Sequence, residues 1–280
     1  MLGPREVRDL ADRLGVRPTK TRGQNFLVDA NTVRRLVRLA APRPDETVLE
    51  IGPGLGALTL GLLPASGRVL AVEVDPVLAA ALPATARVQV PDAAGALTVI
   101  LADALRLATA DLPAAPTLLA ANLPYNIAVP VLLGLLERVP SIERGLVMVQ
   151  AEVAARLTAA PGTRVYGVPC VKLAWWASSR PAGAVARTVF WPQPHVDSGL
   201  VAFQRRATPA PDEQRLATFA AIDAAFSQRR KTLRAALAGW AGSSALAENR
   251  LRAAGIDPTA RGEQLSVTDY ARLAATKMEA

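Results

Sequence analysis

The first 206 residues alternate between short apolar runs and longer segments whose apolar residues follow helical spacing. The short runs are rich in β-branched side chains and predict strands, at residues 47–51, 68–74, 98–101, 117–121, 145–149, 183–189 and 199–204. The segments between them predict helices, one of which follows the potential N-cap Asp29. Strands that alternate with helices predict an α/β fold with a mostly parallel, doubly wound sheet.

The pattern changes after residue 206. Residues 207–213 (ATPAPDE) predict a proline-containing linker, and residues 214–280 show helical spacing alone. We therefore expect a large α/β domain over residues 1–206 and a small all-helical domain over residues 214–280. Within the first domain, residues 1–28 are expected to form an N-terminal helix and a basic arm.

The helical domain contains one conflict in its pattern. A single helix over residues 219–237 would place Arg229 on the same stripe as the apolar residues. A break in the helix removes this conflict. Because Ser227 is a good N-cap, we predict that a new helix begins at about residue 228.

The chain is strongly basic, with a net charge of 32 − 24 = +8, which is compatible with binding a polyanion. Only four of the 32 cationic residues are Lys. Arg therefore dominates, and Arg makes forked contacts with phosphate and stacks on bases. Just after the predicted break, Arg230, Lys231 and Arg234 would present positive charge to a polyanion or form an ordinary solvated face.

Composition also argues against several classes of site. His195 is the only histidine and Cys170 the only cysteine, so we expect no zinc site, no intramolecular disulfide and a reducing, cytoplasmic location. Asp197 and Ser198 lie too close to His195 along the chain for a hydrolase triad, so we expect a loop there. No secretory leader is evident. Prolines interrupt the uncharged residues 112–136, so we expect no membrane span there. We also expect a monomer.

A glycine-rich loop follows the first predicted strand. Residues 50–56 (EIGPGLG) carry Gly52, Gly54 and Gly56 between strand 47–51 and a helical run at 57–63. Strand, glycine turn and helix begin a nucleotide-binding α/β unit. The G-x-G-x-G spacing differs from the G-x-G-x-x-G of dinucleotide binders, so another nucleotide-like ligand is indicated.

Three acidic residues stand at the ends of three predicted strands. Glu50 precedes the first glycine of the loop, Glu73 lies near the end of strand 68–74, and Asp103 follows strand 98–101. We expect them to converge, because the carboxyl ends of parallel strands meet at one edge of a sheet. Glu73 is placed to accept hydrogen bonds from ribose hydroxyls and Asp103 from an adenine amine. Three carboxylates suit a sulfonium cation better than a pyrophosphate.

Residues 122–125 read Asn-Leu-Pro-Tyr. Asn122 offers a side-chain carbonyl to an exocyclic base amine, and Pro124 stiffens the turn so that the Leu123 carbonyl can serve as a second acceptor. Tyr125 offers a flat face on which a flipped-out base can stack. An ordinary strand end would also favour Asn and Pro. Downstream of a nucleotide-type loop, however, the tetrapeptide favours a methyl-transfer site.

Ten segments match the motifs of a known family in the same order. They are TRGQNFLVD (21–29), EIGPGLGALT (50–59), VEVDPVL (72–78), ADAL (102–105), NLPYNIAVPVL (122–132), MVQAEVAARL (148–157), PGTRVYG (161–167), FWPQPHVDSGLV (190–201), FSQRRKTLRAAL (226–237) and RGEQLSVTDYARLA (261–274). The chain thereby resembles the ribosomal RNA adenine N6-dimethyltransferases, and among them the bacterial small-subunit (16S) enzymes of the KsgA/RsmA type.

This resemblance implies a Rossmann-like class I methyltransferase domain with a small helical RNA-binding domain, and it implies that strands 183–189 and 199–204 form an antiparallel hairpin. The implied cofactor is S-adenosyl-L-methionine. The implied reaction converts two adjacent adenosines near the 3′ end of 16S rRNA, within the small ribosomal subunit, to N6,N6-dimethyladenosine during ribosome biogenesis.

The resemblance also implies roles for individual residues. Contact with the cofactor is implied for Gln24, Asn25, Leu27, Gly52, Gly54, Glu73, Asp103, Ala104 and Asn122. Contact with the target adenosine is implied for Asn122, Leu123, Pro124, Tyr125 and Phe190, the last of which would otherwise be a plain core residue. Contact with RNA is implied for Lys20, Arg22, Arg230, Lys231 and Arg234.

Other functions remain open from the sequence. A related Erm-type methylase modifies a large-subunit adenosine and confers macrolide resistance, whereas FSQRRKTL and RGEQLSVTDYARLA favour the small-subunit enzyme. A DNA adenine methylase normally carries a base-reading module, and none is evident. A non-catalytic RNA-binding assembly factor would not need Asn122, Glu73 and Asp103.

Overall fold

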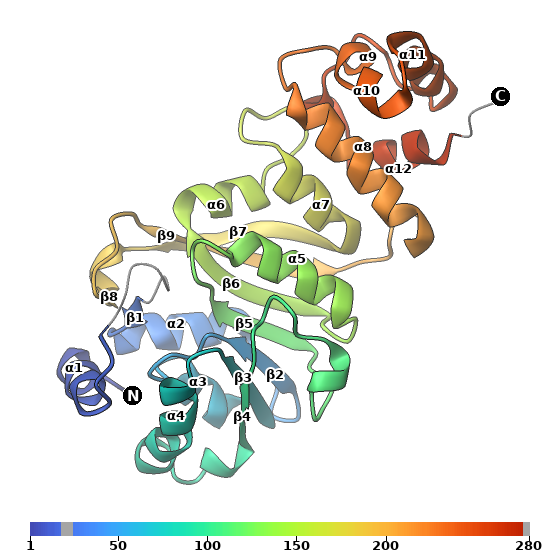
Figure 1. Cartoon of the computed structure of the whole chain (residues 1–280). Coiled ribbons are helices and arrows are strands. Elements are labelled where there is room, and N and C mark those ends of the chain that lie inside the picture. Colours follow the sequence, from blue (N-terminus) through green and yellow to red (C-terminus); the bar gives the residue numbers. More distant parts are fainter. Residues whose placement is uncertain (18–24, 277–280) are drawn as a thin grey trace. The chain divides into compact units, whose positions relative to one another are not determined.

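The structure, a computed structural model, describes residues 1–17 and 25–276. The chain divides into two compact units (Figure 1). The sheet unit comprises Met1–Ala154 and Arg180–Arg205, and the helical unit comprises Ala155–Ser179 and Arg206–Ala280. The sequence placed residues 155–179 in the first domain, whereas here they pack with the helices that follow Arg206.

Aromatic packing explains why residues 155–179 join the helical unit. In helix α7 (Val168–Trp176), Trp175 and Trp176 are buried. Both rings meet Phe219 of α8 (Arg215–Ser227) edge-on, with centroids 5.9 and 5.5 Å away. Large apolar side chains on the two helices therefore bury each other, and the sequence separation of the helices hides this contact.

A seven-stranded sheet has the order β4-β3-β2-β5-β6-β9-β7. Its strands are β2 (Thr47–Ile51), β3 (Arg68–Glu73), β4 (Leu97–Leu101), β5 (Leu118–Asn122), β6 (Arg144–Gln150), β7 (Ala177–Val185) and β9 (Ser198–Arg205). The five strands β4, β3, β2, β5 and β6 run parallel to one another, and β9 pairs antiparallel with β6. The predicted doubly wound α/β fold is confirmed, and apolar residues such as Leu49 and Leu119 are fully buried, as expected for a parallel sheet covered on both faces.

The helices of the sheet unit are α1 (Pro4–Arg13), α2 (Ala30–Ala40), α3 (Thr59–Leu62), α4 (Pro76–Gln89) and α5 (Ala128–Arg138); α6 (Ala151–Leu157) crosses the boundary between the units. Asp29 caps α2 as predicted, because its carboxylate accepts from the Thr32 backbone N–H at 2.5 Å. The uncharged stretch 112–136 forms β5, a turn and most of α5. Among the described residues, no helix has the length and apolarity needed to cross a membrane.

A second, two-stranded sheet pairs β1 (Phe26–Leu27) antiparallel with β8 (Phe190–Trp191). Figure 1 shows the blue β1 beside the yellow β8. The strand predicted at 183–189 was wrong in position, because β7 ends at Val185 and Arg187–Val189 form a 3-10 turn. The Asp197 carboxylate accepts from the Arg187 backbone N–H at 2.9 Å and holds this turn.

The helical unit also contains α9 (Leu233–Ala236), α10 (Ala238–Ala241), α11 (Ser244–Ala253) and α12 (Val267–Ala275). The predicted break after α8 is present, but Ser227 was wrongly assigned as the N-cap of the next helix. Its hydroxyl donates to the Ala224 carbonyl at 2.7 Å, and Thr232 is the N-cap of α9. Arg229 lies in the break and pairs with Glu263 at 3.0 Å, so it leaves the apolar stripe.

Candidate active site

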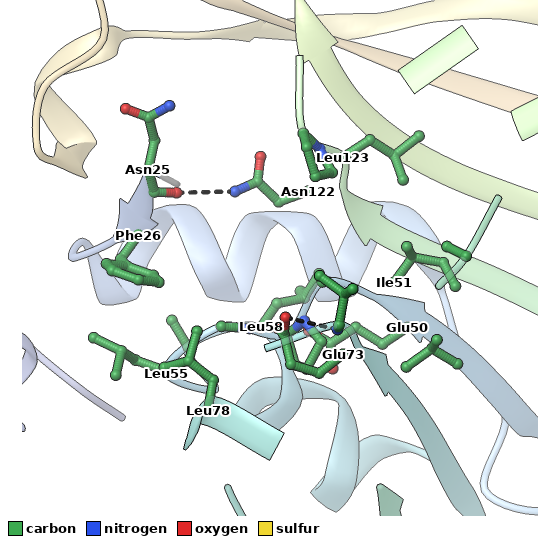
Figure 2. Close-up of a pocket in the computed structure, with 18 of the residues that line it drawn as sticks. Asn25, Phe26, Glu50, Ile51, Leu55, Leu58, Glu73, Leu78, Asn122 and Leu123 are labelled. Carbon is green, nitrogen blue, oxygen red and sulfur yellow. Dashed lines mark hydrogen bonds between the residues drawn. The ribbon is translucent and has the colours of Figure 1, made fainter. Parts of the chain in front are cut away.

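One pocket lies at the carboxyl edge of the sheet in the sheet unit. The glycine loop after β2, the ends of β3 and β5, the segment after β4, and β1 all line it. The structure brings Glu50 of β2, Glu73 of β3 and Asp103, which follows β4, together there; Figure 2 shows Glu50 and Glu73 in the pocket. This is the arrangement that alternating parallel strands predict.

The backbone of the glycine loop requires its glycines. Gly52 and Gly54 adopt φ values of 67° and 58°, a left-handed conformation that other residues rarely take. A Cβ atom on Gly54 would also lie 2.9 Å from the ring of Phe26. The loop can therefore approach Phe26 of β1 this closely only because Gly54 has no side chain.

The Glu73 carboxylate holds this loop by a hydrogen bond to its backbone. Its Oε2 accepts from the Gly54 backbone N–H at 3.1 Å, and its Oε1 accepts from those of Val74 and Asp75 at 2.9 and 3.0 Å. Burial raises the pKa of Glu73, and the three N–H donors oppose that shift. A carboxylate offers about four acceptor positions, so these bonds leave Oε2 with capacity for a ligand hydroxyl.

Glu50 is the most deeply buried acid of the pocket, at 1% exposure. Its Oε2 has no hydrogen-bond partner among the described residues. Burial raises the pKa of Glu50 to about 8, and the neighbouring charge of Glu73 adds to this shift. Oε2 is therefore open to a hydrogen bond from a ligand, and positive charge on that ligand would favour the ionised form of Glu50.

The raised pKa of Glu50 predicts a pH-dependent stability. The folded protein holds a proton on Glu50 that the unfolded chain loses near its ordinary pKa of 4.5, so ionisation destabilises the fold as pH rises toward about 8. Glu50→Gln does not ionise. In thermal unfolding without ligand, the melting temperature of Glu50→Gln minus that of the parent should therefore increase as the pH rises from about 5 to about 8.5. A constant difference between the two proteins across that range would contradict the shift.

Asn122 ends β5 and enters the same pocket. Its Nδ2 donates to the backbone carbonyl of Asn25 at 3.2 Å, as Figure 2 shows. Because the Asn122 amide nitrogen is bonded to the Asn25 carbonyl, the Asn122 Oδ1 is available as an acceptor in the pocket. Nearby, the Leu123 backbone N–H donates to the Met148 carbonyl at 3.0 Å, which fixes the turn to β6.

Tyr125 closes the tetrapeptide. Its hydroxyl lies 2.8 Å from the hydroxyl of Ser198, the first residue of β9. Burial raises the pKa of Tyr125, so the phenol stays protonated at neutral pH. The ring is half-buried and its hydroxyl is held at one end.

The pocket includes most of the residues that the resemblance assigned to cofactor and target. Asn25, Leu27, Gly52, Gly54, Glu73, Asp103, Ala104, Asn122, Leu123, Pro124 and Tyr125 all line it. The Asp103 Oδ1 accepts from the Leu105 backbone N–H at 2.9 Å, which leaves Oδ2 for a ligand. Phe190 is buried in β8 and is not among the lining residues.

Some assigned residues fall elsewhere. Gln24, Lys20 and Arg22 lie outside the described residues. Arg230 and Lys231 are exposed in the segment between α8 and α9 of the helical unit. Arg234, in α9, is also exposed and pairs with Glu248 at 3.1 Å.

Sequence reasoning missed Phe26. It lines the pocket between Asn25 and Leu27, and its ring stacks on Trp191 with centroids 6.4 Å apart. Strand alternation predicts that Phe26 faces away from its two neighbours. All three residues line the pocket nevertheless. The available signal was the aromatic residue itself, in a segment already assigned to the cofactor.

Comparisons with known proteins identify the family of the chain. A family model described as ribosomal RNA adenine dimethylase matches residues 17–278. A protein named ribosomal RNA small subunit methyltransferase A from Kineococcus radiotolerans is 63% identical, covering 98% of this chain and 91% of its own. The protein of that name from Streptomyces griseus is 61% identical, covering 100% and 96%.

Solved structures show the same fold. A dimethyladenosine transferase from Plasmodium falciparum superposes with a TM-score of 0.73 at 22% identity, covering 89% of this chain and 95% of its own. The 23S rRNA methyltransferase ErmE superposes with a TM-score of 0.66 at 26% identity, covering 89% and 98%. The chain therefore belongs to the ribosomal RNA adenine dimethylase family.

Proposed function

We propose that this protein transfers methyl groups from S-adenosyl-L-methionine to N6 of two adjacent adenosines near the 3′ end of 16S rRNA, in the small ribosomal subunit. The proposal rests on one observation: the Asn122 Nδ2 donates to the Asn25 carbonyl, in a pocket that three acidic residues also line. Relatives at 61–63% identity with small-subunit names support the choice of substrate.

The pocket fits the proposed cofactor chemically. Buried Glu50, with its unpartnered oxygen, and Glu73 favour a ligand with cationic groups. Glu73 would accept from the ribose and Asp103 from the adenine amine, while Gly52 and Gly54 leave room for the methionine part. When bound, the cofactor supplies an electrophilic methyl group on a sulfonium sulfur.

The residues after β5 would act on the target amine. The adenosine leaves its stack and lies on the face of Tyr125. Its N6 lone pair is delocalised into the ring, so it is a poor nucleophile. If the Asn122 Oδ1 and the Leu123 carbonyl accept its two N–H groups, the nitrogen becomes more pyramidal and its lone pair is directed toward the methyl group. The N–CH3 bond would form as the S–CH3 bond breaks, and the alkylated nitrogen then loses a proton readily, so no strong base is needed. Catalysis is then mainly positioning, which contributes roughly 7–11 kcal/mol in favourable cases.

The substrate test compares three nucleic acids. We expect methyl uptake from labelled cofactor by free small subunits, and far less by large-subunit RNA or duplex DNA. Uptake by large-subunit RNA would favour an Erm-type activity, for which the fold shared with ErmE leaves room. Uptake by none of the three would favour a non-catalytic assembly factor.

We further propose that the helical domain predicted over residues 214–280 docks on RNA through Arg230, Lys231 and Arg234. All three side chains are exposed. Phosphate contacts give an affinity that falls with salt by a log–log slope of roughly 0.7 to 0.9 per contact. Replacing the three residues with Ala should weaken small-subunit binding and flatten that slope by about two units, or by up to about three if Arg234 exchanges Glu248 for phosphate.

The control for this triple variant removes cations elsewhere in the helical unit. Arg252 and Arg272 are exposed and pair with Glu248 and Asp269 at 2.8 and 2.6 Å. Their double Ala variant should keep the parent slope over the same salt titration. Equal slopes for the triple variant and the parent would show that the cluster is a solvated face, and would direct attention to Lys20 and Arg22.

A further inference from the structure

The dipeptide Asp197–Ser198, where the chain enters β9, contacts two segments: that of Tyr125, which the proposed function assigns to the target base, and the turn before Phe190, which the family resemblance assigned to it. Ser198 lies 2.8 Å, hydroxyl to hydroxyl, from Tyr125. Asp197 accepts from the Arg187 backbone N–H at the start of the turn that leads to Phe190. We infer that Ser198 is a positioning residue for methyl transfer, which sets the plane of the Tyr125 ring against the target adenine; this inference rests on the proposed function of Tyr125.

Ser198 is fixed firmly enough for this role. Its side chain is fully buried, and its backbone pairs with Gln150 in the antiparallel ladder of β9 and β6. On one side, the Ala151 backbone N–H donates to the Asp197 carbonyl at 3.0 Å. On the other side, Gly199 packs so closely that an added Cβ would lie 2.5 Å from that of Ala154. The Ser198 hydroxyl is therefore attached to a backbone that cannot shift easily.

Tyr125 has the opposite character. It follows β5 in a turn, and the torsion that sets the plane of a phenol ring has a broad minimum. A stacking face is useful only when its plane matches that of the base. The phenol O–H bond and the acceptor lone pair of the oxygen both prefer the plane of the ring, so the hydrogen bond with Ser198 favours the ring plane that contains the Ser198 oxygen.

The neighbours of Ser198 along the chain, Asp197 and His195, both contact Arg187. Asp197 is exposed and bonded to the Arg187 backbone, and the His195 carbonyl accepts from the Arg187 guanidinium at 3.0 Å. These contacts close the loop that contains Phe190. A change at Ser198 could act by loosening that loop instead of acting through Tyr125, so the test must separate the two routes.

A double-mutant cycle separates them. Ser198→Ala, Tyr125→Phe and the double variant are compared for single-turnover methyl transfer to small subunits at saturating cofactor. Each single variant should lower the rate about 2- to 10-fold, the effect of one lost hydrogen bond. The double variant should be no slower than the slower single variant, because the same bond is lost in all three. Cofactor affinity by calorimetry should match that of the parent.

Ser66→Ala is the matched control. It removes a serine hydroxyl that donates to the Leu62 carbonyl at 2.9 Å in the same unit, away from the lining of the pocket. Its transfer rate should equal that of the parent. Thermal unfolding of every variant identifies losses that come from the fold, and Tyr125→Phe keeps the ring, so it remains informative if Ser198→Ala unfolds.

The outcomes separate this inference from the function on which it rests. Rate losses that multiply in the double variant, or an unchanged rate for either single variant, would overturn the positioning role of Ser198. Tyr125→Ala addresses the proposed function itself. If Tyr125→Ala transfers methyl at the parent rate, the stacking assignment fails; if it is inactive while Tyr125→Phe and Ser198→Ala are fully active, only the positioning role fails.

Discussion

Asn122→Ala should lose most methyl transfer while it still binds the small subunit. The side chain would supply one of two acceptors that prepare the amine, and removing one pre-positioned hydrogen-bonding group from a catalytic site typically slows a reaction about 10²- to 10³-fold. Asn122 is oriented for this task, because its Nδ2 donates to the Asn25 carbonyl. The yield of dimethyladenosine by mass spectrometry measures the loss.

A second variant tests the orientation of the amide. Asn122→Asp keeps a side-chain oxygen but replaces the Nδ2 donor with an acceptor, which would face the carbonyl of Asn25. We expect a large loss of transfer for this variant as well, because the contact with the arm becomes repulsive. A near-normal dimethyladenosine yield from Asn122→Ala would remove Asn122 from the mechanism.

The acids of the pocket were accessible from sequence because they depend on local pattern. Glu50, Glu73 and Asp103 stand at the ends of apolar runs, and parallel strands bring such ends to one edge. The contact between Asn122 and Asn25 was not accessible. It joins residues 97 positions apart, and no periodicity connects a backbone carbonyl with a distant amide.

Two of the errors in the sequence predictions share one cause. Ser227 has good N-cap chemistry, but Leu233 donates its backbone N–H to the Ala260 carbonyl, and this tertiary bond favours a later start for α9. Residues 187–189 were assigned to a strand, but Asp197 draws the Arg187 backbone into a turn. Local propensity gives way where one hydrogen bond to another segment decides between two near-equal conformations.

Glu73→Ala should weaken S-adenosylmethionine binding about 10- to 100-fold, the effect of one lost hydrogen bond to a charged group together with a less ordered loop. Glu73 would contact the ribose, and it also accepts from the Gly54, Val74 and Asp75 backbone N–H groups. Without it, the glycine loop loses the support that shapes the cofactor pocket. Isothermal calorimetry measures the affinity, and thermal unfolding shows whether the variant is folded.

Glu73→Gln separates the two contributions. It keeps one oxygen acceptor and the size of the side chain, but its amide nitrogen would face a backbone N–H group, either that of Gly54 or those of Val74 and Asp75. The loop should therefore be disturbed in Glu73→Gln as well. Its affinity for S-adenosylmethionine should lie between those of the parent and Glu73→Ala, since one acceptor remains for the ribose. If a folded Glu73→Ala binds S-adenosylmethionine as tightly as the parent, the ribose is held elsewhere. Glu73 would then serve only to shape the turn between β3 and α4, where its bonds to Val74 and Asp75 already lie.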